Sequence, residues 1–435
     1  MRGRAFDTGF KSEDNLQRDE QGKVYKGTVL EHILIENLTA FYEVGEHNNI
    51  KLRDADWNDA IDMASDLGES VAFTNAYAMN LRNLGELLKR EKELGVKSIT
   101  LLEEIKPLIN CPTQYYSSPS LKNKCLKEYA KSVKKSPSGR TTKVAIDKLI
   151  EDLFAKAEAL KEHIRMTEWI DIDSEAGFYN GYYDNSGKRV EGLYKNNNVR
   201  MMLTSQVFSV MGQTADKNQI EKIVKAADRY LYDEDCGGYR LNSNFNELKT
   251  DMGRMFGFAY GEKENGAVFS HMAVMYANAL YQRGFVKEGY KSLDCLYRQS
   301  MNFDTSRIYP GIPEYFGRNG RGLYHYLTGA ASWYMLTVVT EMFGCKGVMG
   351  DLLIEPKLLK KQFNQGRAGI NLSFNNKRLF IEYINSSSKE VGSYKAIKYF
   401  INDEEMKLIN NQVLISKEKL DQITTKEISI KIILD

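Results

Sequence analysis

The stretch GESVAFTNAYAMNLRNLGELLKREK, residues 68–92, decides the fold class because it predicts a helix whose first half is buried on more than one side. Apolar side chains surround most of that half, at Val71, Ala72, Phe73, Ala76, Ala78 and Met79. A helix at the surface of a domain carries a single apolar stripe. We therefore expect this helix to lie inside a larger helical domain.

Similar helical patterns follow one another from about residue 28 to residue 344. The first begins at a T-x-x-E capping box formed by Thr28 and Glu31, and apolar residues recur behind it at helical spacing. Further patterns lie near residues 118–134, 143–168, 197–211, 217–231, 266–283, 286–299 and 324–343, of which the last is apolar all round. Buried helices that alternate with amphipathic ones predict two concentric layers, an (α/α) toroid.

The pattern changes after Gly344, where short apolar runs separated by turn residues predict strands. These runs cover residues 353–355, 369–374, 378–383, 394–401 and 428–434, and Asn375-Asn376 predicts a turn between two of them. We therefore expect a mainly α chain with a helical domain over residues 1–344. A small β-sandwich-like domain would follow over residues 345–435.

Composition excludes several classes of protein. The 435 residues carry a net charge of +2, which provides no electrostatic footprint for nucleic acid. No apolar run is long enough to span a membrane, and residues 1–15 lack the apolar core of a signal peptide. Five irregularly spaced cysteines indicate neither a disulfide framework nor a zinc site, which favours a reducing, cytoplasmic compartment.

The aromatic content of 11% is unusual, and many tyrosines stand beside Gly, Asn and Asp, as in residues 178–183. Sugar-binding clefts use such surfaces, because an aromatic face packs on the C–H groups of a pyranose ring. Composition alone nevertheless favours tyrosines that belong to the core.

The densest polar cluster is D-A-D-W-N-D-A-I-D, residues 54–62, in a loop between two buried helices. It is not an EF-hand loop, because Asp59 and Ser65 stand where that loop has Gly and Glu. It can cap a helix, or it can form an acid–base site with Trp57 as a platform for a sugar. Taken alone, the cluster slightly favours the structural interpretation.

A second cluster, K-E-N-G-A-V-F-S-H at residues 263–271, runs from a polar loop into an apolar helix. His271 at a helix start can contact an anion with help from free backbone N–H groups, or it can cap the helix. A third cluster over residues 317–333 offers the Thr328 hydroxyl and the unencumbered N–H of Gly329. It is not the nucleotide-binding GxxxxGK[ST] loop, so we expect no ATP.

These motifs together resemble glycoside hydrolase family 94. The resemblance rests on D-W-N-D followed by G-E-S-V, then K-E-N-G-x-x-F-S-H, then Y-L-T-G-A-A-S-W, in the order and rough spacing of that family. It extends from about Thr28 to Pro356. The family contains inverting phosphorylases of cellobiose, cellodextrin, chitobiose and β-1,2-gluco-oligosaccharides, and it implies an (α/α)6 barrel.

The resemblance assigns roles residue by residue. Asp59, the second Asp of D-W-N-D, matches the general acid of the family, and Trp57 matches a residue that lines the sugar site. Lys263 matches a sugar-binding lysine, with Glu264 beside it, and Glu314 lies in a loop that forms the sugar site. His271, Thr328 and Gly329 match the phosphate ligands. The resemblance implies no metal and no organic cofactor, with inorganic phosphate as co-substrate.

The chain also departs from the family. The usual D-W-N-D-G-M is D-W-N-D-A-I here. The motifs A-D-W-N-D-x-x-D-M-A, residues 55–64, and G-E-S-V-A-F, residues 68–73, resemble the β-1,2-oligoglucan branch more than cellobiose phosphorylase. Nothing in the sequence resembles the N-terminal β-sandwich and first helices of the family. We therefore expect an incomplete barrel, with apolar side chains exposed near residues 28–44 and 324–343. A separate chain that supplies the N-terminal half, or a homodimer, would be its protein partner.

The predicted reaction follows from one acidic and one anion-binding cluster. A phosphorylase requires only the acid, since phosphate is already an anionic nucleophile, whereas an inverting hydrolase requires a second carboxylate to activate water. The prediction is phosphorolysis of a β-linked gluco-oligosaccharide to α-glucose 1-phosphate, with no nucleic acid and no membrane as partner. A water-using (α/α)6 hydrolase and an inactive truncated fragment are the alternatives.

Overall fold

The computed structural model describes residues 16–53, 55–134, 136–309, 311–325 and 329–435. The chain forms two compact units, each with its own core. The first consists of the chain up to Tyr232 together with Leu241–Gly266. The second consists of Asp233–Arg240 together with Ala267–Asp435.

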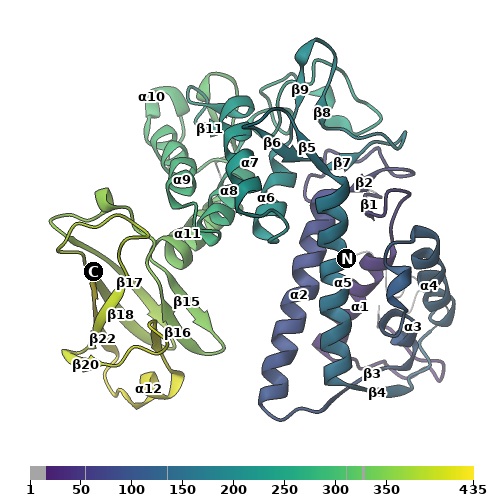
Figure 1. Ribbon diagram of the computed structural model, residues 1–435, viewed down its shortest axis with the longest axis horizontal. Coiled ribbons are helices and arrows are strands. Elements are labelled where there is room, and N and C mark those ends of the chain that lie inside the picture. Colours follow the sequence, from purple (N-terminus) through teal and green to yellow (C-terminus); the bar gives the residue numbers. More distant parts are fainter. Residues whose placement is uncertain (1–15, 54, 135, 310, 326–328) are drawn as a thin grey trace. The chain divides into compact units, whose positions relative to one another are not determined.

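Three helices form the frame of the first unit (Figure 1). They are α1 (Val29–Tyr42), α2 (Val71–Glu93) and α5 (Ile146–Thr167). Side by side, α2 and α5 share a core that includes Leu81, Leu88, Leu153 and Leu160. Their close approach depends on Gly85, because a Cβ there would stand 2.9 Å from the ring of Phe154. The helix predicted over residues 68–92 is thus confirmed, with one face buried in this core.

Between α2 and α5 the sequence predicted one helix, near residues 118–134, but not the two strands that flank it. Strand β3 (Ser98–Leu102) pairs antiparallel with β4 (Thr141–Ala145) and closes a loop that contains α3 (Lys106–Ile109) and α4 (Pro119–Ser132). In β3 only Leu101 and Leu102 are buried, and β4 carries a single large apolar side chain, Val144, so each strand gives only a short apolar signal.

Short strands and two further helices complete the first unit. Strands β1 (Ile50–Lys51), β2 (Glu69–Ser70) and β7 (Tyr182–Tyr183) form one sheet at an end of α2 and α5 (Figure 1). Strands β5 (Trp169–Asp171) and β6 (Gly177–Tyr179) pair, as do β8 (Gly192–Leu193) and β9 (Val199–Arg200). The helices are α6 (Leu203–Met211) and α7 (Lys217–Tyr230), and β10 (Tyr232–Asp233) leads out of the unit.

The helical part of the second unit follows the predicted pattern. It contains β11 (Gly238–Tyr239), α8 (Ser270–Gln282), α9 (Val286–Met301), α10 (Phe303–Ser306) and α11 (Gly329–Thr337) with a π turn over Val338–Met342. Strand β12 (Val268–Phe269), which directly precedes α8, forms a small sheet with β13 (Tyr315–Phe316) and β14 (Gly322–Leu323). Apolar Met335 and Leu336 of α11 are 62% and 46% exposed, whereas on α1 only the first residue, Val29, is a large exposed apolar side chain.

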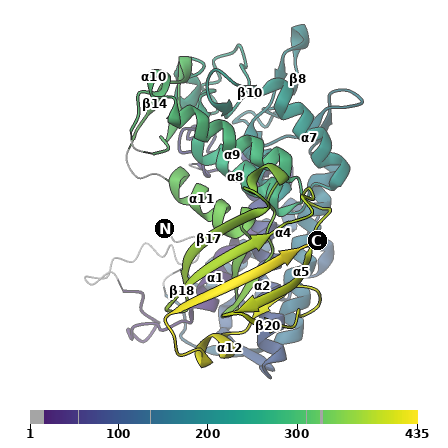
Figure 2. The same cartoon turned by 90° about the vertical axis from the view of Figure 1, so that its left-hand side faces the viewer.

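Two sheets form the C-terminal part (Figure 2). One contains β15 (Cys345–Val348), β16 (Asp351–Ile354) and β21 (Val413–Ile415). The other has the order β17 (Arg367–Phe374), β18 (Lys377–Ile384), β22 (Glu427–Leu434), β19 (Ala396–Ile401) and β20 (Glu404–Met406). Alternate residues of β22 are buried and pair with buried residues of β18, as Ile430 does with Ile381. Helix α12 (Lys417–Gln422) precedes β22.

These elements confirm a mainly helical chain followed by β strands. The turn predicted at Asn375-Asn376 is present, and both residues have positive φ angles, 47° and 59°, as two-residue hairpin turns require. The toroidal arrangement and the domain boundary between residues 344 and 345 stay predictions.

Single turns of 3-10 helix occur at Glu103–Ile105, Thr113–Tyr115, Lys195–Asn197, Arg254–Gly257, Arg318–Gly320 and Lys360–Gln362.

Candidate functional site

The D-W-N-D loop is held against a second loop of the same unit. The backbone N–H of Met255 donates to the carbonyl of Ala60 at 3.0 Å, and the N–H of Arg254 donates to the Asp62 carboxylate at 3.2 Å. Gly253 permits this contact, because a Cβ at that position would stand 2.1 Å from the Ala60 carbonyl oxygen. The loop that ends at the K-E-N-G motif is therefore packed beside the loop that carries Asp59.

Two carboxylates of the D-W-N-D loop have different environments. Asp56 accepts a hydrogen bond from the Ser70 hydroxyl at 2.7 Å and one from the backbone N–H of Asn58 at 3.1 Å. Burial raises the pKa of Asp56, although both hydrogen bonds lower it. Asp59 is exposed, while the intervening Asn58 is buried. Asp56 therefore anchors the loop, and Asp59 is the carboxylate that can meet a substrate.

The capping interpretation of this cluster is settled by Ser70. Its hydroxyl accepts from the backbone N–H of Phe73 at 2.9 Å and so caps α2. The described aspartates of the cluster therefore do not cap this helix, and Asp54 lies outside the described residues.

The K-E-N-G loop is shaped by two asparagine side chains. Asn265 donates to the Phe258 carbonyl at 2.8 Å, and Asn242 accepts from the N–H of Gly266 at 2.8 Å. Lys263 has a positive φ of 46°, and its ammonium group lies 5.0 Å from the centre of the Phe258 ring. Glu264 has one buried carboxylate oxygen, Oε2, without a hydrogen-bond partner among the described residues. A buried oxygen of this kind can accept a hydrogen bond from a sugar hydroxyl.

Three predicted site residues meet in the second unit. The backbone N–H of Ser270 donates to the carbonyl of Glu314 at 2.9 Å, which places Glu314 beside the start of α8. Gly329 begins α11, and a Cβ there would stand 2.9 Å from Cε1 of His271. His271, Glu314 and Gly329 therefore come together from three separate segments. Thr328 lies outside the described residues.

His271 does not cap α8, since the N-cap is Phe269 and His271 is the second residue of the helix. Its ring is half-buried, and burial lowers the pKa of the imidazole. The ring centre lies 6.2 Å from that of Trp333. A neutral imidazole beside the N-terminus of a helix can donate one hydrogen bond to an anion.

The candidate residues divide between the two units. Trp57, Asp59, Lys263 and Glu264 belong to the first, and His271, Glu314 and Gly329 to the second.

Sequence reasoning missed two buried carboxylates of the first unit. Glu191 accepts hydrogen bonds from the backbone N–H groups of Gly181 and Met202, and burial raises its pKa to about 8. Asp184 forms a buried ion pair with Lys249 at 3.0 Å. The D-N-S-G turn at residues 184–187 marks Asp184 as a turn residue, but no motif in the sequence marks Glu191.

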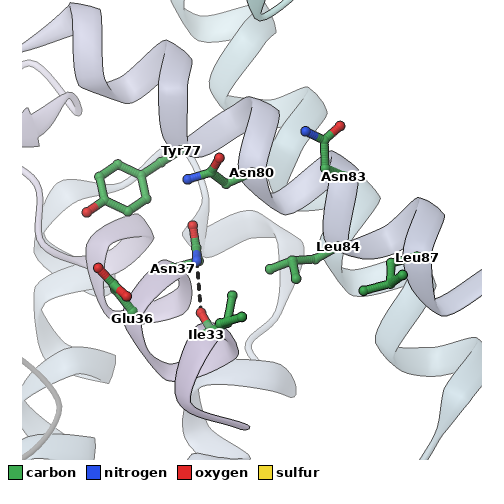
Figure 3. Close-up of a pocket in the computed structure, with 8 residues that line it drawn as sticks. All are labelled: Ile33, Glu36, Asn37, Tyr77, Asn80, Asn83, Leu84 and Leu87. Atoms are coloured by element: carbon green, nitrogen blue, oxygen red, sulfur yellow. Dashed lines mark hydrogen bonds between the residues drawn. The ribbon is translucent and has the colours of Figure 1, made fainter. Parts of the chain in front are cut away.

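A pocket of about 540 Å³ lies between α1 and α2, and it contains none of the predicted site residues (Figure 3). Asn37 donates to the Ile33 carbonyl at 2.8 Å at its floor, with Tyr77 and Asn80 of α2 on the opposite side.

Within the described ranges, no cluster of three His, Cys, Asp or Glu side chains could hold a metal ion. Within these ranges too, no helix combines the length and apolarity that crossing a membrane requires.

Comparison with known proteins identifies the central part of the chain. The model of the glycosyl hydrolase 94 superfamily catalytic domain matches residues 142–344. The chain is therefore similar to this superfamily over residues 142–344, a little under half of its length. Lys263, Glu264, His271, Glu314, Thr328 and Gly329 lie within the glycosyl hydrolase 94 match, whereas Trp57 and Asp59 precede it.

Several curated relatives of the chain are phosphorylases. Cellobionic acid phosphorylase of Neurospora crassa is 25% identical over 46% of the chain and 25% of its own length. Solabiose phosphorylase of Paenibacillus borealis is 23% identical over 76% of the chain and 37% of its own length. N,N'-diacetylchitobiose phosphorylase of Vibrio proteolyticus is 26% identical over 42% of the chain and 24% of its own length. The chain thus spans about a quarter to somewhat over a third of these relatives.

The similarity to solabiose phosphorylase reaches beyond the matched domain. Its 76% share of the chain is more than residues 142–435 make up, so part of it precedes residue 142. The first unit is therefore at least partly included in that similarity.

Proposed function

We propose that the chain forms part of an inverting phosphorylase, longer or split, that acts on a β-linked gluco-oligosaccharide. The observation that carries this proposal is the packing of His271 against Gly329 within the glycosyl hydrolase 94 segment. A neutral imidazole and the backbone N–H groups at two helix starts suit a phosphate anion. The phosphorylase relatives support the same reaction class.

In this reaction a phosphate oxygen bonds to the anomeric carbon of the terminal glucosyl unit while the glycosidic C–O bond breaks. Attack comes from the face opposite the leaving oxygen, so a β-glucoside gives α-glucose 1-phosphate. Asp59 donates its proton to the leaving oxygen, directly or through a sugar hydroxyl. Its exposure in a loop anchored by Asp56 supports this role.

Trp57, Lys263, Glu264 and Glu314 would contact the sugar, and Thr328 would complete the phosphate site with His271 and Gly329. The linkage we propose is β-1,2, on the basis of A-D-W-N-D-x-x-D-M-A at residues 55–64 together with G-E-S-V-A-F at residues 68–73.

A hydrolase that uses water is the second candidate, and Glu264 is the observation that favours it. Its buried oxygen without a partner could activate water opposite Asp59. Asp56 and Asp62 are less suited to this task, because each already accepts hydrogen bonds within the loops.

The test incubates the complete enzyme, of which this chain forms part, with β-1,2-gluco-oligosaccharides, with and without phosphate, and identifies the products by NMR. We expect α-glucose 1-phosphate only when phosphate is present, and a rate reduced about 10²–10⁴-fold in Asp59→Asn. Asp66→Asn, an exposed aspartate of the same loop, is the matched control. Release of free glucose without phosphate would establish the hydrolase instead.

Phosphate binding is tested separately, so that the result does not depend on the rest of the enzyme. We expect the ³¹P NMR signal of inorganic phosphate to broaden with the wild-type chain and much less with His271→Ala. Equal broadening by both proteins would contradict the assignment of His271 to phosphate.

A further inference from the structure

A cavity of about 650 Å³ in the second unit lies away from all predicted site residues. One wall is helix α9, and the other is the segment around residues 359–361 together with Glu390. Its volume falls within the range of about 300–1,000 Å³ that small-molecule sites occupy. Because both walls belong to one compact unit, the cavity is defined by that unit alone.

The lining of this cavity is strongly basic. Five cationic side chains contribute to it, against two carboxylates. The cations are Lys287, Lys291, Arg298, Lys360 and Lys361, and the carboxylates are Asp294 and Glu390. This excess of positive charge contrasts with the nearly neutral chain as a whole, which has a net charge of +2.

Both carboxylates are already engaged by groups of the protein. Asp294 forms an ion pair with Arg298 and accepts a hydrogen bond from the Tyr290 hydroxyl at 3.0 Å. Glu390 accepts from the backbone N–H groups of Lys360 and Val391, each at 3.0 Å, and these bonds hold its pKa below the usual range. A ligand in the cavity would therefore meet mainly ammonium groups.

An aromatic ring and an apolar side chain complete the lining. The ammonium group of Lys361 lies 4.1 Å from the centre of the Tyr290 ring. Leu359 is buried beside them. An aromatic face with apolar surface next to it suits the C–H face of a pyranose, while clustered ammonium groups suit a phosphate.

We propose that this cavity binds a sugar phosphate, with the phosphate among the lysines and the sugar ring toward Tyr290 and Leu359. The site is independent of the proposed function, because it shares no residue with the candidate catalytic and phosphate-binding sets.

The test is protection of lysines from acetylation, with α-glucose 1-phosphate as the probe and mass spectrometry of the digested chain as the readout. We expect acetylation of Lys287, Lys291, Lys360 and Lys361 to fall several-fold when the probe is present. Lys395 and Lys407, which are exposed in the same unit, should not change. No protection at the four cavity lysines would overturn the proposal.

Two further probes test which part of the ligand the cavity recognises. Glucose alone should protect none of the four lysines. Inorganic phosphate should protect them less than the sugar phosphate does at equal concentration, and equal protection would overturn the assignment to a sugar phosphate.

Variants of the cavity lysines test whether the probe binds in the cavity. Lys287→Gln combined with Lys360→Gln should weaken binding of the probe at least about tenfold in calorimetry, since two charged partners of the phosphate are lost. Lys395→Gln combined with Lys407→Gln is the matched control and should leave the affinity unchanged. Protection must also persist in His271→Ala, because loss of protection there would place the probe at the candidate catalytic site.

Discussion

The hydroxyl of Ser70 donates to the Asp56 carboxylate at 2.7 Å and accepts from the backbone N–H of Phe73 at 2.9 Å. One side chain thus both caps α2 and fixes the loop that presents Asp59. The position of the candidate acid is therefore linked to the start of the main helix of the first unit.

Ser70→Ala should lower the free energy of unfolding by about 2–4 kcal/mol. Loss of a helix cap costs about 1 kcal/mol, and a buried carboxylate deprived of a hydrogen-bond donor costs about 1–3 kcal/mol more. Ser118→Ala is the control, since Ser118 caps α4 through the N–H of Leu121 and does not contact Asp56. Urea denaturation gives both values, and equal losses would show that the bond to Asp56 contributes nothing.

Gly329→Ala should weaken phosphate binding without much loss of stability. The added Cβ would stand 2.9 Å from the His271 ring, so the imidazole must move away from its present position. We expect a higher apparent KM for phosphate in the complete enzyme and less ³¹P broadening with this chain. Gly257→Ala is the control, because a Cβ there has no neighbour within 4 Å. Unchanged phosphate binding in Gly329→Ala would argue against His271 as a ligand.

The sequence predicted those helices and strands whose own residues carry a clear apolar pattern. The alternating isoleucines of β22 and the apolar first half of α2 predict a strand and a buried helix without knowledge of their neighbours. The β3–β4 pair was not predicted, since each strand has only five residues and its partner lies across the loop that contains α3 and α4.

The candidate site, too, could be predicted only in part. Sequence motifs identify the D-W-N-D cluster, but they do not tell which of its carboxylates is buried. That difference arises because Ser70 lies close to Asp56 and not to Asp59, a tertiary contact that neither residue type reveals. Glu191 was missed for a related reason, since its partners Gly181 and Met202 contribute only backbone N–H groups.

Glu191 should make the first unit less stable as the pH rises from about 4.5 to about 8. Burial raises the pKa of its carboxyl to about 8 in the folded chain, so the unfolded chain releases this proton first. The stabilisation from the protonated Glu191 carboxyl is complete below the pKa of this group in the unfolded chain. It is lost as the pH rises through the pKa in the folded chain, and the free energy of unfolding falls by at most about 1.4 kcal/mol per pH unit. Urea denaturation at pH 5, 6, 7 and 8 measures it. In Glu191→Gln this slope should disappear, and its persistence would assign it to another group.

Lys122 should make the first unit more stable as the pH rises, in contrast to Glu191, and its effect should begin at higher pH. Its ammonium group is fully buried, lies 4.2 Å from the centre of the Phe41 ring and has no hydrogen-bond partner among the described residues. Burial, with a smaller contribution from the charge of Lys156, lowers the pKa of Lys122 to about 7. The unfolded chain therefore holds this proton up to about pH 10, whereas the folded chain releases it near pH 7.

It follows that the free energy of unfolding should rise between about pH 7 and pH 10, by at most about 1.4 kcal/mol per pH unit. Lys122→Met replaces the ammonium group with an apolar side chain of similar length, so it should stabilise the protein by about 1–3 kcal/mol at pH 6 and remove this rise. Lys124→Met on the exposed side of α4 is the control and should change neither quantity. Denaturation by urea at pH 6, 7, 8 and 9 gives both curves. If Lys122→Met destabilises the chain at pH 6, the buried ammonium group must have a stabilising partner, and the assigned direction of its pKa shift is wrong.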